Sequence, residues 1–307
     1  MTKHATHDIP EDQQDDDLLD VAARVRQVEL ITRRLVNDTL AGQYHAVFKG
    51  RGMSFDSVRE YQPGDDVRTI DWNVSARTGG VFVKQYVEER ELTVLLAVDL
   101  SGSMGFGSKR RSKRDLAAEI AAVLAFSALR NNDRVGLVLF SDHIEHYVPP
   151  KKGRAHILRL VRDILGTQPK GKQTRLDAAC DYLSKIVRKR SVVFVLSDFL
   201  DGDFERALGV LARRHDLVPL VIGDRAEMTL PDLGGVIQWE DPETGELLLF
   251  DAGHAASRQT FWQRQQVGRR KLEQAQRKHG VEPIEAWVGE DYLAGLVNYF
   301  LRRAARQ

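Results

Sequence analysis

The sequence predicts an α/β protein built on a doubly wound, mostly parallel sheet, and three observations lead to this prediction. Residues 92–98 and 191–197 are apolar almost throughout, as expected for strands that are buried on both faces. Two more apolar strands, 134–140 and 217–222, follow the same pattern. Segments with helical composition separate these strands, and such alternation is typical of a parallel sheet covered by helices on both sides.

The N-terminal part of the chain carries less regular signals. We expect residues 1–17 to form a flexible tail, because they are polar and end in a run of acidic residues. Apolar residues recur at helical spacing over 18–40, which predicts an amphipathic helix. A turn at 62–65 and a strand at 81–87 follow, so residues 18–91 are predicted to form an N-terminal segment ahead of the sheet.

The central α/β domain is predicted to span residues 92–225. Besides the four strands it contains a hairpin strand at 145–148 and helices at 112–130, 154–165, 176–188 and 204–214. After residue 225 the alternation stops. We expect a C-terminal extension (226–307) packed on the domain, made of a hairpin of 236–240 with 247–250, a polar helix at 254–279, a strand at 281–286 and a helix at 292–303.

Composition restricts the function classes. The chain has 45 basic and 44 acidic residues, so its net charge gives no reason to expect a nucleic-acid or anionic-membrane partner. The single cysteine, Cys180, excludes an internal disulfide and favours a reducing compartment. No apolar run approaches the roughly 20 residues that span a bilayer, and the N-terminus lacks the apolar core of a signal peptide. We therefore expect a cytoplasmic protein without a membrane span.

Side chains that carry oxygen follow the first buried strand. Asp99, Ser101 and Ser103 lie in a glycine-containing turn directly after it, and Mg²⁺ prefers oxygen ligands of this kind. In a doubly wound sheet, ligands bind at the carboxyl ends of strands, where the direction of winding reverses. If strands 92–98 and 191–197 are neighbours there, Asp198 lies beside Asp99, and the polar loop that contains Thr174 can add a third hydroxyl.

These five residues resemble the metal-ion-dependent adhesion site of von Willebrand factor type A domains, in which a DxSxS motif is joined by a distant Thr and Asp. Residues 60–68 (EYQPGDDVR) and 70–77 (IDWNVSAR) are similar to the signature of a bacterial family of von Willebrand factor A-like proteins, catalogued as domain of unknown function 58. The resemblance extends over roughly residues 30–300. It implies a von Willebrand factor A-like, Rossmann-type fold and an association with MoxR-type AAA+ ATPases.

By this resemblance Ser101, Ser103 and Thr174 bind Mg²⁺ through their hydroxyls, with Mn²⁺ or Ca²⁺ as alternatives. Asp99 and Asp198 hold the cation largely through water molecules. Neutral direct ligands leave the cation with positive charge, so an acidic side chain of a partner can bind to it. The expected function is therefore that of a non-enzymatic protein-interaction module, which docks an acidic partner residue and works with a MoxR-type ATPase in complex assembly or maturation.

Two other functions remain open from the sequence. A Mg²⁺-dependent phosphohydrolase could use Asp99 as its nucleophile, but Ser101, two residues later, offers no carboxylic acid for proton transfer. A nucleic-acid adaptor could bind phosphates through basic residues near the predicted site. The same basic residues could instead form a rim for an acidic partner: Lys109, Arg110, Arg111, Lys113 and Arg114, with Lys151, Lys152 and Arg154 further along the chain.

The signature segment is expected to have a structural role. Its charged residues are predicted to form turns and ion pairs that anchor the N-terminal segment to the sheet: Arg59, Asp65, Asp66, Arg68, Asp71 and Arg77. Trp72 is expected to lie in the core.

Overall fold

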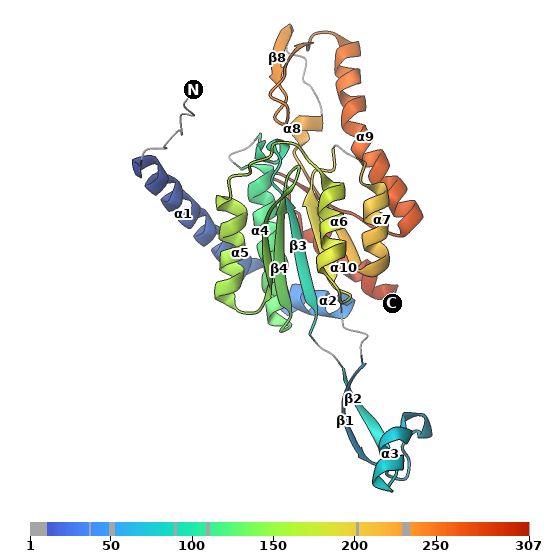
Figure 1. Ribbon diagram of the computed structural model, residues 1–307. Coiled ribbons are helices and arrows are strands. Elements are labelled where there is room, and N and C mark those ends of the chain that lie inside the picture. The colour runs from blue at the N-terminus through green and yellow to red at the C-terminus, as the bar shows by residue number, and fades with distance from the viewer. Residues whose placement is uncertain are drawn as a thin grey trace, which may run out of the picture.

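The computed structural model describes residues 11–36, 38–48, 53–88, 91–108, 111–200, 203–228 and 234–306. Its centre is a sheet with the strand order β10-β7-β6-β3-β4-β5 (Figure 1). The strands are β3 (Thr93–Asp99), β4 (Arg134–Phe140), β5 (Ile144–Lys151), β6 (Val192–Ser197), β7 (Asp216–Gly223) and β10 (Ile284–Trp287). β5 is antiparallel to β4 and the other neighbours are parallel, which confirms the predicted fold class.

The direction of winding reverses at β3. The chain leaves β3 for β4 on one side, and later returns through β6, which pairs with β3 on the other side. The register places Val98 opposite Leu196, so both strands end at the same edge of the sheet. The predicted adjacency of strands 92–98 and 191–197 is therefore confirmed, and their carboxyl ends form the expected switch point.

Two helical layers cover the sheet (Figure 1). Helices α1 (Glu11–Leu35), α2 (Asp38–Phe48), α4 (Lys113–Arg130), α5 (Arg154–Gly166) and α10 (Leu293–Ala305) share one apolar core. Helices α6 (Leu176–Ile186), α7 (Glu205–Arg214) and α9 (Ala255–His279) share the core on the opposite face. On the first face the rings of Phe48, Phe194 and Phe300 pack edge to face, so α2, the sheet and α10 meet in one contact.

The terminal segments differ from the predicted boundaries. Helix α1 begins at Glu11 rather than at residue 18, so the acidic run is largely helical, as the favourable charge of acidic residues near a helix N-terminus allows. Residues 1–10 of the predicted tail lie outside the described residues. The predicted helix 18–40 is two helices, since α1 ends at Leu35 and α2 begins at Asp38. The C-terminal segment is more than a packed extension, since β10 pairs with β7 and extends the central sheet.

The signature segment forms a small lobe that projects below the sheet in Figure 1. It consists of β1 (Met53–Glu60) and β2 (Phe82–Glu88), which pair antiparallel, with the 3-10 helix η1 (Val67–Thr69) and α3 (Trp72–Thr78) between them. Arg59 donates two hydrogen bonds of 2.7 Å to Asp65, while Asp66 and Asp71 cap η1 and α3.

The expected turn-forming role of these residues is thus confirmed, but the predicted anchoring to the central sheet is wrong. The residues that Arg59, Asp66 and Asp71 contact all belong to the lobe itself. The predicted core position of Trp72 is also wrong, because its residue is 69% exposed. Helix α3 has seven residues and none of them is buried, so it offers no interior for an indole ring.

A second hairpin lies beyond the carboxyl edge of the sheet, and the longest C-terminal helix runs from the level of this hairpin down beside α7 (Figure 1). Strands β8 (Val236–Glu240) and β9 (Leu247–Asp251) pair with each other and not with the central sheet. They follow the short helix α8 (Arg225–Met228) and lead into α9, whose Leu272 and Ala275 are buried in the core. None of the described helices combines the length and the apolar composition that crossing a membrane requires.

Helix α9 contacts the segment after β6 through a glycine. A Cβ atom at Gly268 would lie 1.8 Å from the carbonyl oxygen of Phe199, next to Asp198. Gly268→Ala is therefore expected to lower the free energy of unfolding by about 1–3 kcal/mol, since either the helix or the backbone must move. Gly42→Ala is the matched control: Gly42 is exposed on α2 with nothing near its Cβ position, so alanine should stabilise by up to about 1 kcal/mol. Urea denaturation measures both, and equal effects would contradict this account.

Candidate metal centre

Four of the five predicted metal ligands meet at the carboxyl edge of the sheet. Asp99 is the last residue of β3, Ser101 and Ser103 lie in the following loop with its 3-10 helix η2 (Gly102–Gly105), and Asp198 follows β6. The hydroxyl oxygens of Ser101 and Ser103 are 3.1 Å apart, and the Ser103 hydroxyl donates to Asp198 Oδ2 at 2.7 Å. Each of the four residues is at most 7% exposed. The winding of the sheet brings them together across about 100 residues of sequence.

The Asp99 carboxylate is held from two sides. Its Oδ1 accepts a hydrogen bond from the backbone N–H of Ser101 at 2.8 Å, and its Oδ2 accepts one from the Ser197 hydroxyl at 2.7 Å. Complete burial, together with the charge of Asp198, raises the pKa of Asp99 to about 7. Ser197 was not among the residues predicted for the site, although a polar residue at the end of an apolar strand indicates a role at the sheet edge.

Lys113 lies in the same cluster, and its predicted position on an exposed basic rim is wrong. Its side chain is 0% exposed, and the ammonium donates to Asp198 Oδ2 at 2.9 Å and to Glu227 Oε1 at 2.8 Å. Burial alone would lower the pKa of Lys113, but the carboxylates of Asp198 and Glu227 hold it above its usual value. The sequence gives no clear signal for this burial, because the first turn of α4 is charged (Lys113, Arg114, Asp115) and the helix becomes apolar around most of its circumference only from Leu116 onward.

The loop that carries Thr174 lies against the serine-containing loop. Glu145 Oε1 accepts hydrogen bonds from the N–H groups of Lys170 and Gly171, both at 2.9 Å, and the carbonyl of Lys172 accepts from the N–H of Gly102 at 2.7 Å. The Thr174 hydroxyl itself donates to Glu243 Oε1 at 2.7 Å. The loop of Thr174 is thus placed beside the serine-containing loop, but the Thr174 hydroxyl donates to the carboxylate of Glu243, which was not predicted for the site.

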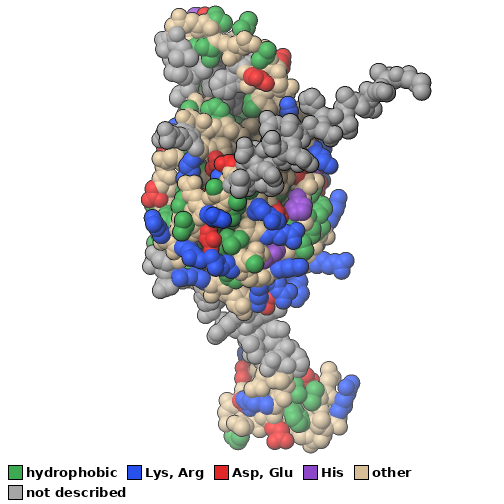
Figure 2. Space-filling view, turned by 90° about the vertical axis from the view of Figure 1, so that its left-hand side faces the viewer, with side chains coloured by type: hydrophobic (Ala, Val, Ile, Leu, Met, Phe, Trp, Pro, Cys, Tyr) green, Lys and Arg blue, Asp and Glu red, His purple; other side chains and the backbone are tan. Residues whose placement is uncertain are grey.

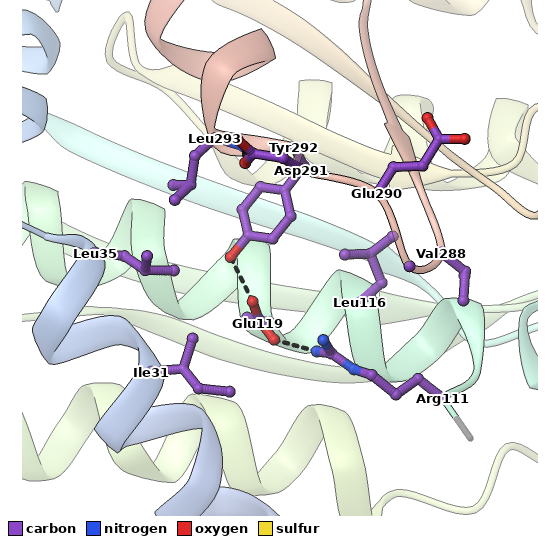
Figure 3. A pocket seen from close by; sticks show the side chains of 11 residues that line it. Ile31, Leu35, Arg111, Leu116, Glu119, Val288, Glu290, Asp291, Tyr292 and Leu293 are labelled. Atoms are coloured by element: carbon purple, nitrogen blue, oxygen red, sulfur yellow. Dashed lines mark hydrogen bonds and ion pairs between the residues drawn. The ribbon is translucent and has the colours of Figure 1, made fainter. Parts of the chain in front are cut away.

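Two further residues of the predicted basic rim, Arg111 and Arg114, also bind to groups within the chain. The guanidinium of Arg111 pairs with Glu119, and the Tyr292 hydroxyl donates to the other oxygen of that carboxylate at 2.7 Å (Figure 3). These groups border a cavity of about 390 Å³ between α1, α4 and the start of α10. Arg114 donates to the carbonyl oxygens of Ile164 and Thr167. Lys109 and Arg110 lie outside the described residues.

The second basic stretch lies at the opposite edge of the sheet. Lys151 pairs with Val135 near the start of β4, whereas Asp99 pairs with Phe140 at its end. Lys152 and Arg154 form ion pairs with Glu91 and Glu29. On the face shown in Figure 2, Lys and Arg side chains are spread over the middle and lower parts of the body, away from the hairpin at its top. For the described residues, the suggestion that the two basic stretches form one rim at the site is therefore wrong.

The residues present fit a divalent cation. Octahedral Mg²⁺ with bonds of about 2.0–2.1 Å places adjacent ligands about 3.0 Å apart, close to the 3.1 Å between the Ser101 and Ser103 hydroxyls. When Asp99, Asp198 and Glu227 are ionised, the ammonium of Lys113 balances one of three negative charges, and a divalent cation would balance the other two. No group of three or more His, Cys, Asp or Glu side chains among the described residues is arranged to hold a metal, so a cation here depends on the hydroxyls.

Comparison with known proteins identifies the family. The family described as "Protein of unknown function DUF58" matches residues 57–271, which is more than half of the chain. This chain belongs to the DUF58 family. It is 32% identical over 286 residues to "Uncharacterized protein Rv1480" of Mycobacterium tuberculosis (strain ATCC 25618 / H37Rv), an alignment that covers 92% of this chain and 90% of that protein.

Further matches are shorter or more distant. "Uncharacterized protein YeaD" of Bacillus subtilis (strain 168) is 27% identical over 108 residues, 35% of this chain and 25% of that protein. The crystal structure of the hypothetical protein BatB from Bacteroides thetaiotaomicron matches with a TM-score of 0.46 and 15% identity, over 70% of this chain and all of that one. The structure of the SpRpn10 VWA domain matches with a TM-score of 0.34 and 14% identity, over 68% of this chain and 94% of that one.

Proposed function

We propose that this DUF58 protein is a non-enzymatic interaction module that binds an acidic side chain of a partner protein through a divalent cation, Mg²⁺ in the first place. Ser101, Ser103 and Thr174 would supply hydroxyl ligands, and Asp99 and Asp198 would supply the balancing charge. Since its direct ligands would mostly be neutral oxygens, the cation would remain a Lewis acid that can take up a further oxygen ligand, such as a carboxylate of a partner. The observation that carries this proposal is the buried group of two serine hydroxyls and two carboxylates at the switch point.

The surroundings of Asp99 favour docking over phosphohydrolase chemistry. The carboxylate is fully buried, and both of its oxygens already accept hydrogen bonds. A nucleophile must present a lone pair to the substrate, and a general acid is needed nearby to protonate the leaving group. Ser101, two residues later, has no ionisable side chain, and Lys113 is engaged by Asp198 and Glu227. The nucleic-acid alternative loses support because Arg111, Lys113 and Arg114 are occupied within the chain.

Titration of Mg²⁺ in a calorimeter tests the proposed site. Ser101→Ala combined with Ser103→Ala should weaken Mg²⁺ binding by at least about 100-fold, since two direct ligands are lost, while the circular dichroism spectrum is kept. Ser127→Ala is the matched control: this serine is equally buried, but it lies on α4 and donates to the carbonyl of Val123. An unchanged Mg²⁺ affinity in the double variant would refute the site.

We further propose that the protein acts in the cytoplasm beside a MoxR-type AAA+ ATPase, the partner that its family resemblance implies. The expected result is that immobilised wild-type protein retains such an ATPase, or its protein substrate, in Mg²⁺ and releases it on addition of a chelator. The double serine variant should retain neither. If the partner is retained equally with and without chelator, and equally by the double serine variant, partner binding does not depend on the metal site.

A further inference from the structure

The turn of the β8–β9 hairpin lies directly on the candidate metal centre. A Cβ atom on Gly102 would lie 2.0 Å from the carbonyl oxygen of Pro242. The backbone of the turn therefore touches the backbone of the residue between the two serines, a contact that glycine alone permits. No strand of the central sheet pairs with β8 or β9, so this contact is not a by-product of sheet formation.

The turn presents one carboxylate to the site. Glu243 Oε1 accepts a hydrogen bond from the Thr174 hydroxyl at 2.7 Å, and Oε2 accepts one from the Thr174 N–H at 3.3 Å. The turn is itself organised, because Asp241 Oδ1 accepts from the N–H groups of Glu243 at 2.8 Å and Thr244 at 3.1 Å, and Gly245 closes it with a φ of 71°. Glu243 is therefore held in place by its own backbone and by a predicted metal ligand.

We propose that Glu243 is an intramolecular carboxylate ligand of the cation, and that the β8–β9 hairpin competes with the acidic side chain of a partner for the same position. This inference rests on the proposed function. A carboxylate tethered in place acts at a high effective concentration, so a partner that offers one free acidic side chain must displace it. The hairpin regulates access to the cation in this way.

Moving the β8–β9 hairpin away from the metal centre should require little free energy. The hairpin has two strands, and an isolated two-stranded hairpin is at best marginally stable in water. Several of its large apolar side chains face solvent: Val236, Leu247 and Leu249 are 65%, 58% and 76% exposed. By contrast, α9, which follows the hairpin, is fixed through Gly268, Leu272 and Ala275. The hairpin can leave the site while the central sheet and α9 stay in place.

Mn²⁺ is a suitable probe, because water proton relaxation reports the exchangeable waters on the bound ion. Glu243→Gln should weaken Mn²⁺ binding by about tenfold, since a charged ligand is lost. It should also raise the relaxivity per bound ion, because water takes the vacated position, and acetate should then lower that relaxivity in the variant more than in the wild type. Glu246→Gln, an exposed residue of the same turn, is the matched control and should change neither quantity.

The possible results separate this inference from the proposed function. Equal relaxivity and equal Mn²⁺ affinity in wild type and Glu243→Gln would overturn the role of Glu243 while leaving the serine site intact. Absence of Mn²⁺ binding to the wild type, or binding that survives in the double serine variant, would overturn both. Hydrogen exchange gives a second readout: Mg²⁺ should slow exchange of the turn amides in the wild type, and unchanged exchange would also count against the role of Glu243.

Discussion

Replacing Lys113 with methionine is expected to lower the free energy of unfolding by about 3–5 kcal/mol, because it leaves two buried carboxylates without their shared cation. The Lys113 side chain is 0% exposed, and its ammonium lies 2.9 Å from Asp198 and 2.7 Å from the nearer oxygen of Glu227. Methionine fills a similar volume, so the loss reflects charge and not a cavity. Chemical denaturation in the presence of a chelator measures the change.

An exposed ion pair provides the control for Lys113. Lys278 lies 2.6 Å from Glu205, but its side chain is 64% exposed, so Lys278→Met should cost less than about 1 kcal/mol. Adding Mg²⁺ should recover part of the loss in Lys113→Met and none in Lys278→Met, since Asp198 belongs to the proposed site. If the two variants lose equal stability, Lys113 is not the internal cation of the cluster.

Asp99→Asn is expected to have opposite effects on stability and on metal binding. Burial and the charge of Asp198 raise the pKa of Asp99 to about 7, from the 3.8 usual for an aspartate. Between these pH values the folded protein binds more protons than the unfolded chain. The free energy of unfolding of the metal-free protein therefore falls as the pH rises from about 4 to about 7. Asparagine has a similar shape and no charge there, so the part of the fall that Asp99 contributes should disappear, while the part from Asp133, whose burial raises its pKa to about 6, should remain.

At pH 8 without metal, Asp99→Asn should therefore be more stable than the wild type, by about 1–4 kcal/mol. It should gain little from Mg²⁺, because it has lost part of the charge that balances the cation. Thermal unfolding at pH 5 and pH 8, with and without Mg²⁺, tests both statements, and Asp181→Asn, exposed on α6, serves as control. A variant that is less stable than wild type at pH 8, or that Mg²⁺ stabilises equally, would contradict the account.

The central sheet could be predicted because the amino-acid composition of each strand indicates how deeply that strand is buried. Strands β3 and β6 are buried on both faces, so they are apolar without alternation, and the intervening helices impose parallel pairing. The order of helices and strands then left few topologies, and in those Asp99 and Asp198 end at one edge. Ser101 and Ser103 are close to Asp99 in sequence, so their proximity required little beyond the turn itself.

Other parts of the site could not be predicted, because they depend on contacts between distant side chains. The run of basic residues from Lys109 to Arg114 suggests a solvated surface, yet the packing of α4 places Lys113 inside and turns Arg111 toward Glu119. The hairpin was predicted with nearly correct ends, but nothing in its sequence indicates that its turn meets Gly102 and Thr174. Trp72 was predicted for the core because its side chain is large and apolar. It is exposed because the lobe that carries it is too small to bury an indole ring.

The composition and order of the elements were enough to predict the doubly wound sheet, the switch point between β3 and β6, and four of the residues that meet there, because burial on both faces is encoded locally. Only long-range packing shows that the buried ammonium of Lys113 lies against Asp198 and that the hairpin brings the carboxylate of Glu243 to Thr174. Charge balance and access to a cation depend on which distant side chains the folded chain brings within about 3 Å.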